Sequence, residues 1–281
     1  MKNKSVLISG SSTGIGKACA LYLDRLGYKV YAGVRKESDA EKLMSESSKN
    51  LKPVILDVTD SKSIDNTLRE IEADTESEFF GLVNNAGIGI SGVLEAVEIE
   101  DVRKLMDVNV IGLLALTQKF IPLLKKSKGK IINIGSTSSY LSFPGGSAYA
   151  GSKFAVRAIT DALRLELNPF GISVTLISPG AVESEIWNKS RSYKEKIRES
   201  IDPQILEDYK ELIKFGKNIL EKIKPIPAIE VAKSVETALS SLQPKRYYYV
   251  GSDCKAAAKF SKLPGSLKDK MILKKIKKLG K

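Results

Sequence analysis

The sequence has no histidine, and this absence excludes several kinds of active site. Hydrolases with a Ser-His-Asp triad, zinc sites held by imidazoles and dehydrogenases that relay protons through histidine all need that side chain. Acid–base chemistry must therefore come from Tyr, Lys, Asp, Glu, Cys or water. The two cysteines, Cys19 and Cys254, lie far apart in sequence and indicate neither a disulfide framework nor a metal cluster, which suits a reducing compartment.

Signals that would direct the chain to a membrane are also missing. The first residues, Met1–Lys4, lead directly into the apolar Val6–Ile8 and have no signal-peptide pattern. We also expect no apolar run long enough to cross a bilayer. These absences favour a cytoplasmic protein.

Positive charge is unevenly distributed along the chain. The net charge is +12, and residues 255–281 contribute +9 of it through ten lysines and a single acid, Asp269. Residues 1–254 therefore carry only +3. Because the basic charge belongs to a tail and not to the body, we expect no nucleic-acid partner.

Short apolar segments alternate with helical ones along the chain. The apolar segments are rich in β-branched residues, as expected for strands covered on both faces. The alternation predicts an α/β fold with a doubly wound parallel sheet, and the 281 residues without repeats or linkers predict a single domain over 1–254. Strands are predicted at 4–9, 28–34, 52–57, 79–84, 129–135, 172–178 and 247–251, and helices at 14–26, 38–48, 61–74, 100–125, 147–168 and 228–242.

A glycine-rich turn follows the first predicted strand. Glycines between a strand and a helix let the backbone approach a phosphate, which then lies at the positive helix N-terminus. A plain glycine–serine turn is one alternative, and Lys17 suggests another, a P-loop. The P-loop spacing fails, because five residues separate Gly10 from Gly16 and Ala18 stands where Ser or Thr should bind magnesium. The dinucleotide site would then use Gly10, Ser12, Thr13, Gly14, Ile15 and Gly16.

The spacing Gly-x-x-x-Gly-x-Gly resembles that of the short-chain dehydrogenase/reductase family, and further motifs follow in the family's order up to residue 184. The resemblance implies a Rossmann-type fold, with adenine contacts after the third strand and nicotinamide contacts after the sixth. It also implies a turn beside the cofactor at Asn84–Gly87. Ser9 stands where Thr is usual but keeps the hydroxyl. The cofactor contacts implied are Asp57, Val58, Asn85, Ala86, Gly87, Pro179, Gly180, Val182 and Ser184, together with Tyr149 and Lys153.

The end of the second strand predicts which dinucleotide binds. NAD-dependent enzymes of this type carry an acid there, which bonds the ribose hydroxyls. Here Val34 holds the place, and Arg35 and Lys36 follow. An arginine can bind a 2′-phosphate that an acid would repel, so we expect NADP(H). A solvated basic pair at the start of a helix is the alternative.

Tyr149 and Lys153 lie one helical turn apart in Tyr-Ala-Gly-Ser-Lys. A tyrosine pKa near ~10 is too high for a base at neutral pH, and a neighbouring ammonium should lower it. Tyr149 could then give a proton to a carbonyl oxygen or take one from an alcohol. Such a pair is common on helix surfaces, but Tyr-x-x-x-Lys is also the catalytic signature of the family that the chain resembles.

Two further residues complete the catalytic group that the resemblance implies. Ser136 lies thirteen residues before Tyr149, at the family's spacing for the serine that bonds the substrate oxygen, with Ser138 as the rival. Asn109 matches the family's helix asparagine, which holds a water that connects Lys153 to solvent. The predicted catalytic residues are therefore Asn109, Ser136, Tyr149 and Lys153, with no metal.

The helix-rich insertion at 185–225 follows the predicted cofactor loop, and we expect it to act as a lid over the substrate. Its apolar residues predict a small hydrophobic carbonyl or alcohol as substrate. Glu185–Trp187 and Arg246–Gly251 resemble retinol dehydrogenases, 17β-hydroxysteroid dehydrogenases and acyl-dihydroxyacetone-phosphate reductases. The resemblance also implies a homodimer or homotetramer that pairs through the helices at 100–125 and 147–168. A noncatalytic NADP-sensing or lipid-surface binding protein is the alternative.

The tail at 255–281 contains a possible amphipathic helix. Ser266, after Pro264 and Gly265, would cap it. Its apolar residues would form roughly one face, with lysines around the remainder. Such a helix could lie on an anionic membrane, or it could pack its apolar stripe on the body or a second subunit. The apolar residues are Leu267, Met271, Ile272, Ile276 and Leu279.

Overall fold

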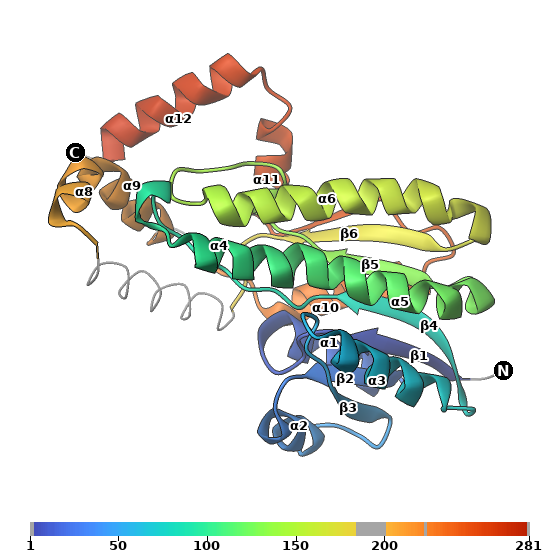
Figure 1. Ribbon diagram of the computed structural model, residues 1–281. Helices are drawn as coiled ribbons and strands as arrows, with labels where there is room; N and C mark the ends of the chain where they lie inside the picture. Colours follow the sequence, from blue (N-terminus) through green and yellow to red (C-terminus); the bar gives the residue numbers. More distant parts are fainter. Residues whose placement is uncertain (1–2, 184–200, 222–223, 280–281) are drawn as a thin grey trace.

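Seven parallel strands form one sheet in the computed structural model, in the order β3-β2-β1-β4-β5-β6-β7 (Figure 1). The structure describes residues 3–183, 201–221 and 224–279. Every predicted strand is present within a residue or two of its expected bounds, which confirms the doubly wound parallel sheet. The strands are β1 (Asn3–Ile8), β2 (Lys29–Val34), β3 (Leu51–Ile55), β4 (Ser77–Asn84), β5 (Lys130–Ile134), β6 (Ser173–Pro179) and β7 (Tyr247–Val250).

Helices cover both faces of the sheet (Figure 1). Alternate residues of a strand point to opposite faces, and in β1 the side chains of Val6 and Ile8 join one core cluster while Leu7 joins the other. Burial on both faces explains why the strands are continuous apolar runs. The first cluster packs under α1 (Gly14–Arg25), α2 (Glu37–Met44) and α10 (Ala228–Ser240), and the second under α3 (Ser61–Glu72), α5 (Gly112–Ser127) and α6 (Ser147–Leu167).

The segment predicted as one helix over 100–125 has three parts. Helix α4 (Ile99–Met106) passes through a π-helical turn, η2 (Asp107–Ile111), into α5. By length and mean hydropathy the run Ile99–Ser127 could cross a bilayer, so our expectation that no such run exists was wrong. In this fold its largest buried side chains, among them Leu116 and Phe120, pack against the sheet.

The chain after β7 forms two helices, α11 (Ser252–Phe260) and α12 (Gly265–Leu279). Helix α11 runs across the predicted boundary at residue 254 and buries Ala257 and Ala258. Helix α12 begins at Gly265, so Ser266 lies inside the first turn and does not cap the helix as predicted. The described part of the predicted lid contains α8 (Pro203–Asp208) and α9 (Lys210–Leu220), and α12 packs against α9.

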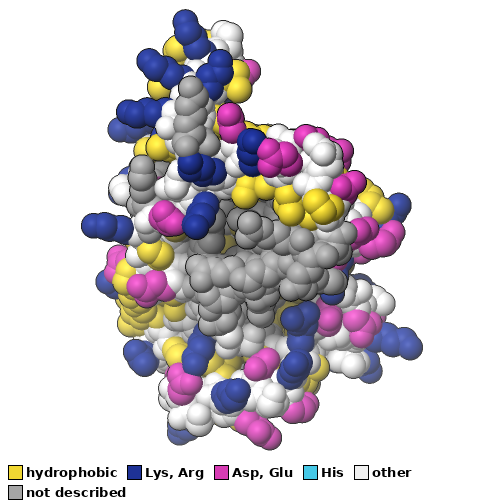
Figure 2. Space-filling view, turned by 90° about the vertical axis from the view of Figure 1, so that its left-hand side faces the viewer, with side chains coloured by type: hydrophobic (Ala, Val, Ile, Leu, Met, Phe, Trp, Pro, Cys, Tyr) yellow, Lys and Arg dark blue, Asp and Glu magenta, His cyan; other side chains and the backbone are white. Residues whose placement is uncertain are grey.

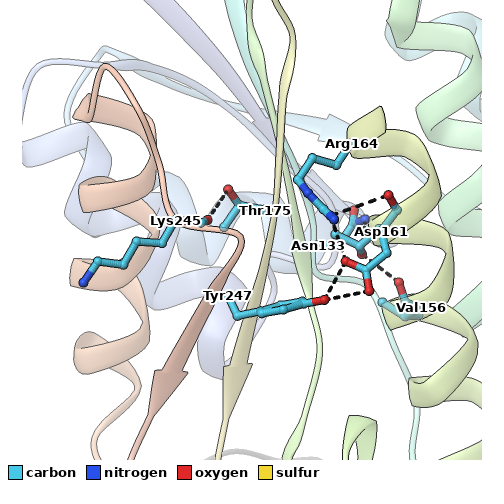
Figure 3. Close-up of polar contacts among 8 residues, drawn as sticks. Asn133, Val156, Asp161, Arg164, Thr175, Lys245 and Tyr247 are labelled. Atoms are coloured by element: carbon cyan, nitrogen blue, oxygen red, sulfur yellow. Dashed lines mark hydrogen bonds and ion pairs between the residues drawn. The ribbon is translucent and has the colours of Figure 1, made fainter. Parts of the chain in front are cut away.

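Partly and fully buried polar contacts hold helix α6 against the strands (Figure 3). The Tyr247 hydroxyl of β7 donates to the Asp161 carboxylate of α6, 2.7 Å from either oxygen, and Arg164 Nη1 lies 2.8 Å from the same group. Asn133 of β5 donates to Thr160 Oγ1 at 2.9 Å. Leaving a buried polar group without a partner is costly, so these contacts favour a single position of α6.

Candidate active site

The carboxyl ends of the seven strands lie along one edge of the sheet, because all seven strands run in the same direction. This edge is on the left of Figure 1 and faces the viewer in Figure 2. The chain continues from β1 toward one side of the sheet and from β4 toward the other, and open α/β sheets bind ligands at such a switch point. The turns after β1, β4, β5 and β6, which hold most predicted site residues, meet at this edge.

The glycine-rich turn after β1 needs glycine at three positions. Gly10 and Gly14 have positive φ values of +70° and +56°. A Cβ on Gly16 would lie 2.1 Å from the Gly10 carbonyl oxygen, so no side chain fits there. Helix α1 starts at Gly14, and the Thr13 side chain makes no capping bond to it. The turn and the positive end of α1 therefore fit a pyrophosphate.

Asn85, after β4, holds this turn in place. Its Nδ2 donates to the carbonyl oxygens of Ser9 and Gly10, at 2.9 and 3.0 Å. The Ser9 hydroxyl in turn accepts hydrogen bonds from the backbone N–H groups of Asn85 and Ala86, both at 3.0 Å. The serine that replaces the usual threonine thus makes the connection between β1 and β4 with its hydroxyl alone.

The end of β2 carries exposed positive charge. Val34 is buried, whereas Arg35 and Lys36 are exposed. Burial by itself raises the pKa of Asp57, but hydrogen bonds from Thr59 and the charge of Arg35 outweigh it and lower that pKa. Arg35 therefore lies close enough to the end of β3 to act on Asp57, at the edge where an adenosine would bind.

Lys17, which suggested a P-loop, is engaged elsewhere. Its Nζ pairs with the Glu46 carboxylate at 2.6 Å, on the surface beyond α2. Its ammonium therefore has an acidic partner outside the glycine-rich turn, which agrees with rejecting a P-loop.

Helix α6 and the turn after β5 bring three of the predicted catalytic side chains together. The Ser136 side chain lies close enough to the Tyr149 hydroxyl to act on its pKa. Lys153 Nζ donates to the Ile134 carbonyl oxygen at 3.0 Å and lies 5.9 Å from the centre of the Tyr149 ring. A substrate oxygen at the Tyr149 hydroxyl would thus also be within reach of Ser136.

The short 3₁₀ turn η3 (Thr137–Ser139) distinguishes Ser136 from its rival, Ser138. The Ser136 hydroxyl accepts a hydrogen bond from the Ser138 N–H at 3.1 Å, and Ser139 Oγ accepts one from the Ser136 N–H at 3.1 Å. This reciprocal capping fixes the Ser136 side chain beside Tyr149. The geometry therefore favours Ser136 as the substrate-binding serine.

Burial determines the protonation states of the catalytic pair. It lowers the pKa of Lys153 to about 8, because the ammonium loses its hydration. It also raises the pKa of Tyr149, although the nearby Ser136 side chain acts in the opposite direction. We expected the Lys153 ammonium to lower the Tyr149 pKa, but in this structure the pKa is raised, and the causes of its shift are burial and Ser136 and not Lys153. Tyr149 is therefore protonated at neutral pH and able to donate a proton.

Asn109 lies in the π-helical turn η2 and is buried. Its Oδ1 accepts from the Ile88 N–H at 2.8 Å, and its Nδ2 donates to the Ile88 carbonyl at 3.0 Å and to Ser152 Oγ at 3.1 Å. A Cβ on Gly87 would lie 3.2 Å from Asn109 Oδ1 and 3.8 Å from Lys153 Nζ. The amide thus joins the turn after β4 to helix α6, and its link to a water stays a prediction.

Asp253, at the start of α11, is a residue that the sequence analysis missed. Its Oδ2 accepts a hydrogen bond from the Ala181 N–H at 2.8 Å, in the loop after β6. A Cβ on Gly180 would lie 1.9 Å from Asp253 Oδ1, so the glycine is needed for this contact. The loop predicted to hold the nicotinamide, with Pro179 and Val182, is therefore positioned from the far end of the chain. Asp253 and Ala181 are 72 positions apart, so no sequence motif indicates this contact.

Comparisons with known proteins agree with this geometry. The family model described as short chain dehydrogenase matches residues 4–195. The chain belongs to the short-chain dehydrogenase family. A short-chain dehydrogenase from Streptomyces avermitilis has the same fold, with a TM-score of 0.78 at 25% identity over 99% of this chain and 97% of that one. One from Burkholderia cenocepacia in complex with NADP has a TM-score of 0.76 at 24% identity, over 97% and 98% of the two chains.

Curated relatives confirm the resemblance to the retinol dehydrogenase group. The chain is 32% identical to human dehydrogenase/reductase SDR family member 9 and 33% identical to mouse retinol dehydrogenase 7, in both cases over 97% of this chain and 88% of the relative. It is also 34% identical to an NADPH-dependent 3-dehydrocapnine reductase from Ornithobacterium rhinotracheale, over 97% of each chain.

The substrate side of this dehydrogenase is described in part. Ser184 and the apolar lid residues Ile186 and Trp187 lie outside the described residues. Phe215 of α9 is buried at 2% exposure and belongs to the core. Tyr140 is buried as well, with the Arg157 guanidinium 4.5 Å from its ring centre, and belongs to a core cluster.

Proposed function

We propose that this short-chain dehydrogenase is an NADP(H)-dependent enzyme that interconverts a hydrophobic carbonyl compound and its alcohol. The observation that carries the proposal is that the Ser136 side chain lies close enough to the Tyr149 hydroxyl to act on its pKa, with the buried Lys153 one helical turn away. A proton donor and a second hydroxyl that converge on one point suit a substrate oxygen better than any structural role.

The chain's own residues would manage the proton while the cofactor supplies the hydride. Bound NADP(H) would give or accept hydride at C4 of its nicotinamide. In reduction, Tyr149 would donate its hydroxyl proton to the substrate oxygen, which Ser136 would hold by a hydrogen bond. Because its pKa is about 8, Lys153 remains largely protonated at neutral pH, and its charge would stabilise the phenolate left behind.

The preference for NADP(H) rests on the end of β2. Arg35 is exposed there, and no acid occupies the place of Val34. A guanidinium can make two charge-assisted hydrogen bonds to a 2′-phosphate, with Lys36 adding a second positive charge. The name of the NADPH-dependent relative and the NADP-bound solved structure support the same assignment.

Exposed apolar side chains near the catalytic group support a hydrophobic substrate. Phe143, after η3, and Ile213 of α9 are each 40% exposed at the edge that carries the catalytic group. Two relatives act, by name, on retinol and on 3-dehydrocapnine. We therefore propose a ketone, aldehyde or alcohol with a long apolar portion.

The test is a screen of carbonyl compounds of graded chain length, followed by NADPH absorbance. We expect turnover that rises with chain length and tighter binding of NADPH than of NADH. Arg35→Ala should reduce that preference by about 1.5–3 kcal/mol, the range for a hydrogen bond to a charged group. Arg25→Ala, an exposed arginine at the end of α1, is the matched control. Equal affinity for the two cofactors, or NADPH binding without any turnover, would contradict the proposal.

We also propose that the enzyme forms a homodimer or homotetramer through α5 and α6. Leu165 of α6 is 68% exposed and Leu114 of α5 is 38% exposed, although both helices lie next to the core. Exposed apolar side chains on two such helices are typical of a subunit interface. Leu165→Glu should lower the mass measured by light scattering, whereas Leu242→Glu, at a 98% exposed position, should not. An unchanged mass for Leu165→Glu would contradict this interface.

A further inference from the structure

Helix α12 stands away from the body of the molecule at the edge that carries the catalytic group (Figure 1). Its main contact is with α9, where Asn218 Nδ2 donates to the Leu279 carbonyl at 2.7 Å. Ile276 is the buried side chain of the helix, at 7% exposure. The remaining length of α12 therefore offers most of its side chains to the surroundings.

The apolar residues of α12 lie on two faces and not on the single face that we expected. Ile272 and Ile276, one turn apart, are half-buried and buried, so that face meets the body. Leu267 and Met271, also one turn apart, are 43% and 48% exposed. Met271 and Ile276 differ by about 140° around the helix axis, so the two pairs point in different directions. Packing on α9 accounts for one pair and leaves the other without a role in the fold.

Lysines surround the exposed pair. Lys270 follows Leu267 by three residues and Lys274 follows Met271 by three, which makes each a neighbour on the helix surface. Lys278 continues the row, and all three lysines are exposed. Helix α12 contains six lysines and a single acid. In Figure 2 the projection at the top of the view carries several basic side chains with hydrophobic ones among them, and the basic residues of α12 are all lysines.

We propose that this outer face of α12, formed by Leu267, Lys270, Met271, Lys274 and Lys278, docks on an anionic lipid surface. Lysine charge is attracted to acidic headgroups, while exposed apolar side chains between the lysines enter the boundary with the acyl chains. A nucleic acid would satisfy the lysines but not Leu267 and Met271. A second copy of the face would place lysines against lysines, which disfavours self-association.

The position of α12 determines how the docked protein would be oriented relative to the lipid surface. The helix packs on α9 in the predicted lid, at the edge of the sheet where the catalytic turns meet. Docking would therefore bring the substrate side of a peripherally bound, cytoplasmic protein toward the lipid. The use of this orientation for a lipophilic substrate rests on the proposed function, whereas the docking itself does not.

Vesicle sedimentation of the full chain, without cofactor or substrate, tests the docking independently of activity. The vesicles contain phosphatidylcholine alone, or phosphatidylcholine and phosphatidylserine in equal parts. The protein should sediment with the second kind at low salt and not with the first. The triple change Lys270→Gln, Lys274→Gln and Lys278→Gln should weaken binding about a hundredfold, since each lysine near an anionic surface contributes about fivefold. The matched control changes Lys49, Lys126 and Lys245, three exposed lysines of the body, to Gln.

A second pair of variants tests the apolar part. Met271→Ser should weaken vesicle binding severalfold, whereas Met44→Ser, at a 52% exposed position on α2, should not. Three results would overturn the proposal: equal losses in the two lysine variants, vesicle binding unchanged in the α12 triple variant, or duplex DNA bound as tightly as the vesicles with no effect of Met271→Ser. An active enzyme that does not sediment with the anionic vesicles would refute the docking but not the proposed function.

Discussion

Helices α6 and α12 both combine apolar residues with charges, but their surroundings differ. Helix α6 packs on β6, meets the turns η2 and η3, and is fixed by the Tyr247–Asp161 hydrogen bonds. Helix α12 packs mainly on α9. On α6 a lysine is buried and its pKa falls to about 8, whereas on α12 the lysines of the outer face are exposed. Similar patterns thus serve different purposes, because packing decides which side chains lose contact with water.

The two helices should differ most in how their substitutions change the rate of turnover. Tyr149→Phe should lower turnover by about a hundredfold or more, the usual scale for a lost general acid, and leave NADPH binding nearly intact. Met271→Ser on α12 should leave turnover of a water-soluble carbonyl substrate unchanged. Steady-state rates and cofactor titrations check both. Substantial turnover by Tyr149→Phe would mean that another group donates the proton.

Substitutions in α6 and α12 should also differ in their effect on the free energy of unfolding. Val156 of α6 is 0% exposed, and Val156→Ala should lower the free energy of unfolding by about 2 kcal/mol, through lost burial and a remaining cavity. Leu273 of α12 is 57% exposed, so Leu273→Ala should change it by less than about 0.5 kcal/mol. Urea denaturation measures both. Equal losses would show that α12 is packed as firmly as α6.

Within the C-terminal region, α11 contacts the cofactor loop through Asp253, whereas α12 packs mainly on α9. Asp253→Ala removes the acceptor for the Ala181 N–H and should weaken NADPH binding about tenfold, the scale of one charge-assisted hydrogen bond. Lys255→Ala, an exposed neighbour on α11, is the control. Calorimetric titration measures the affinity. If both variants bind NADPH like the parent, the loop does not depend on α11.

The smallest effect per measured step is a pH dependence of stability due to Lys153. Its folded pKa of about 8 lies below the ordinary value of 10.5, so the unfolded chain binds more protons between these pH values. The unfolding free energy should therefore rise with pH in this window, by about 1 kcal/mol per unit, relative to Lys153→Met. Below pH 8 the difference between the two proteins should be constant. Denaturation at several pH values checks the slope, and a flat difference across the window would contradict the burial of a titrating amine.

Features set by local sequence could be predicted, and those set by distant contacts could not. The strands follow from continuous apolar runs, and the turn at Gly10–Gly16 follows from glycines between a strand and a helix. The π-helical turn at Asn109 depends on hydrogen bonds to Ile88, which comes from another element. Asp253 contacts a loop 72 residues earlier in the chain. Periodicity carries no information about such pairs.

The division of α12 into two apolar faces was missed for a related reason. Counting apolar residues along the tail suggested one stripe, although Met271 and Ile276 are five residues apart and so do not share a face. Whether a face is buried depends on α9, whose position the tail sequence does not specify. The packing partner, and not the amphipathic pattern, decides which residues remain exposed.

Transfer of a labelled hydride tests the proposed reaction most directly. NADPH that carries deuterium on one or the other face of C4 is supplied with a carbonyl compound that the enzyme reduces, and the alcohol product is analysed by mass spectrometry. We expect a single deuterium on the carbinol carbon from one of the two labelled cofactors and none from the other, with the same face used by the residual activity of Tyr149→Phe. Product without deuterium from either labelled cofactor would contradict hydride transfer from the nicotinamide and with it the proposed reaction.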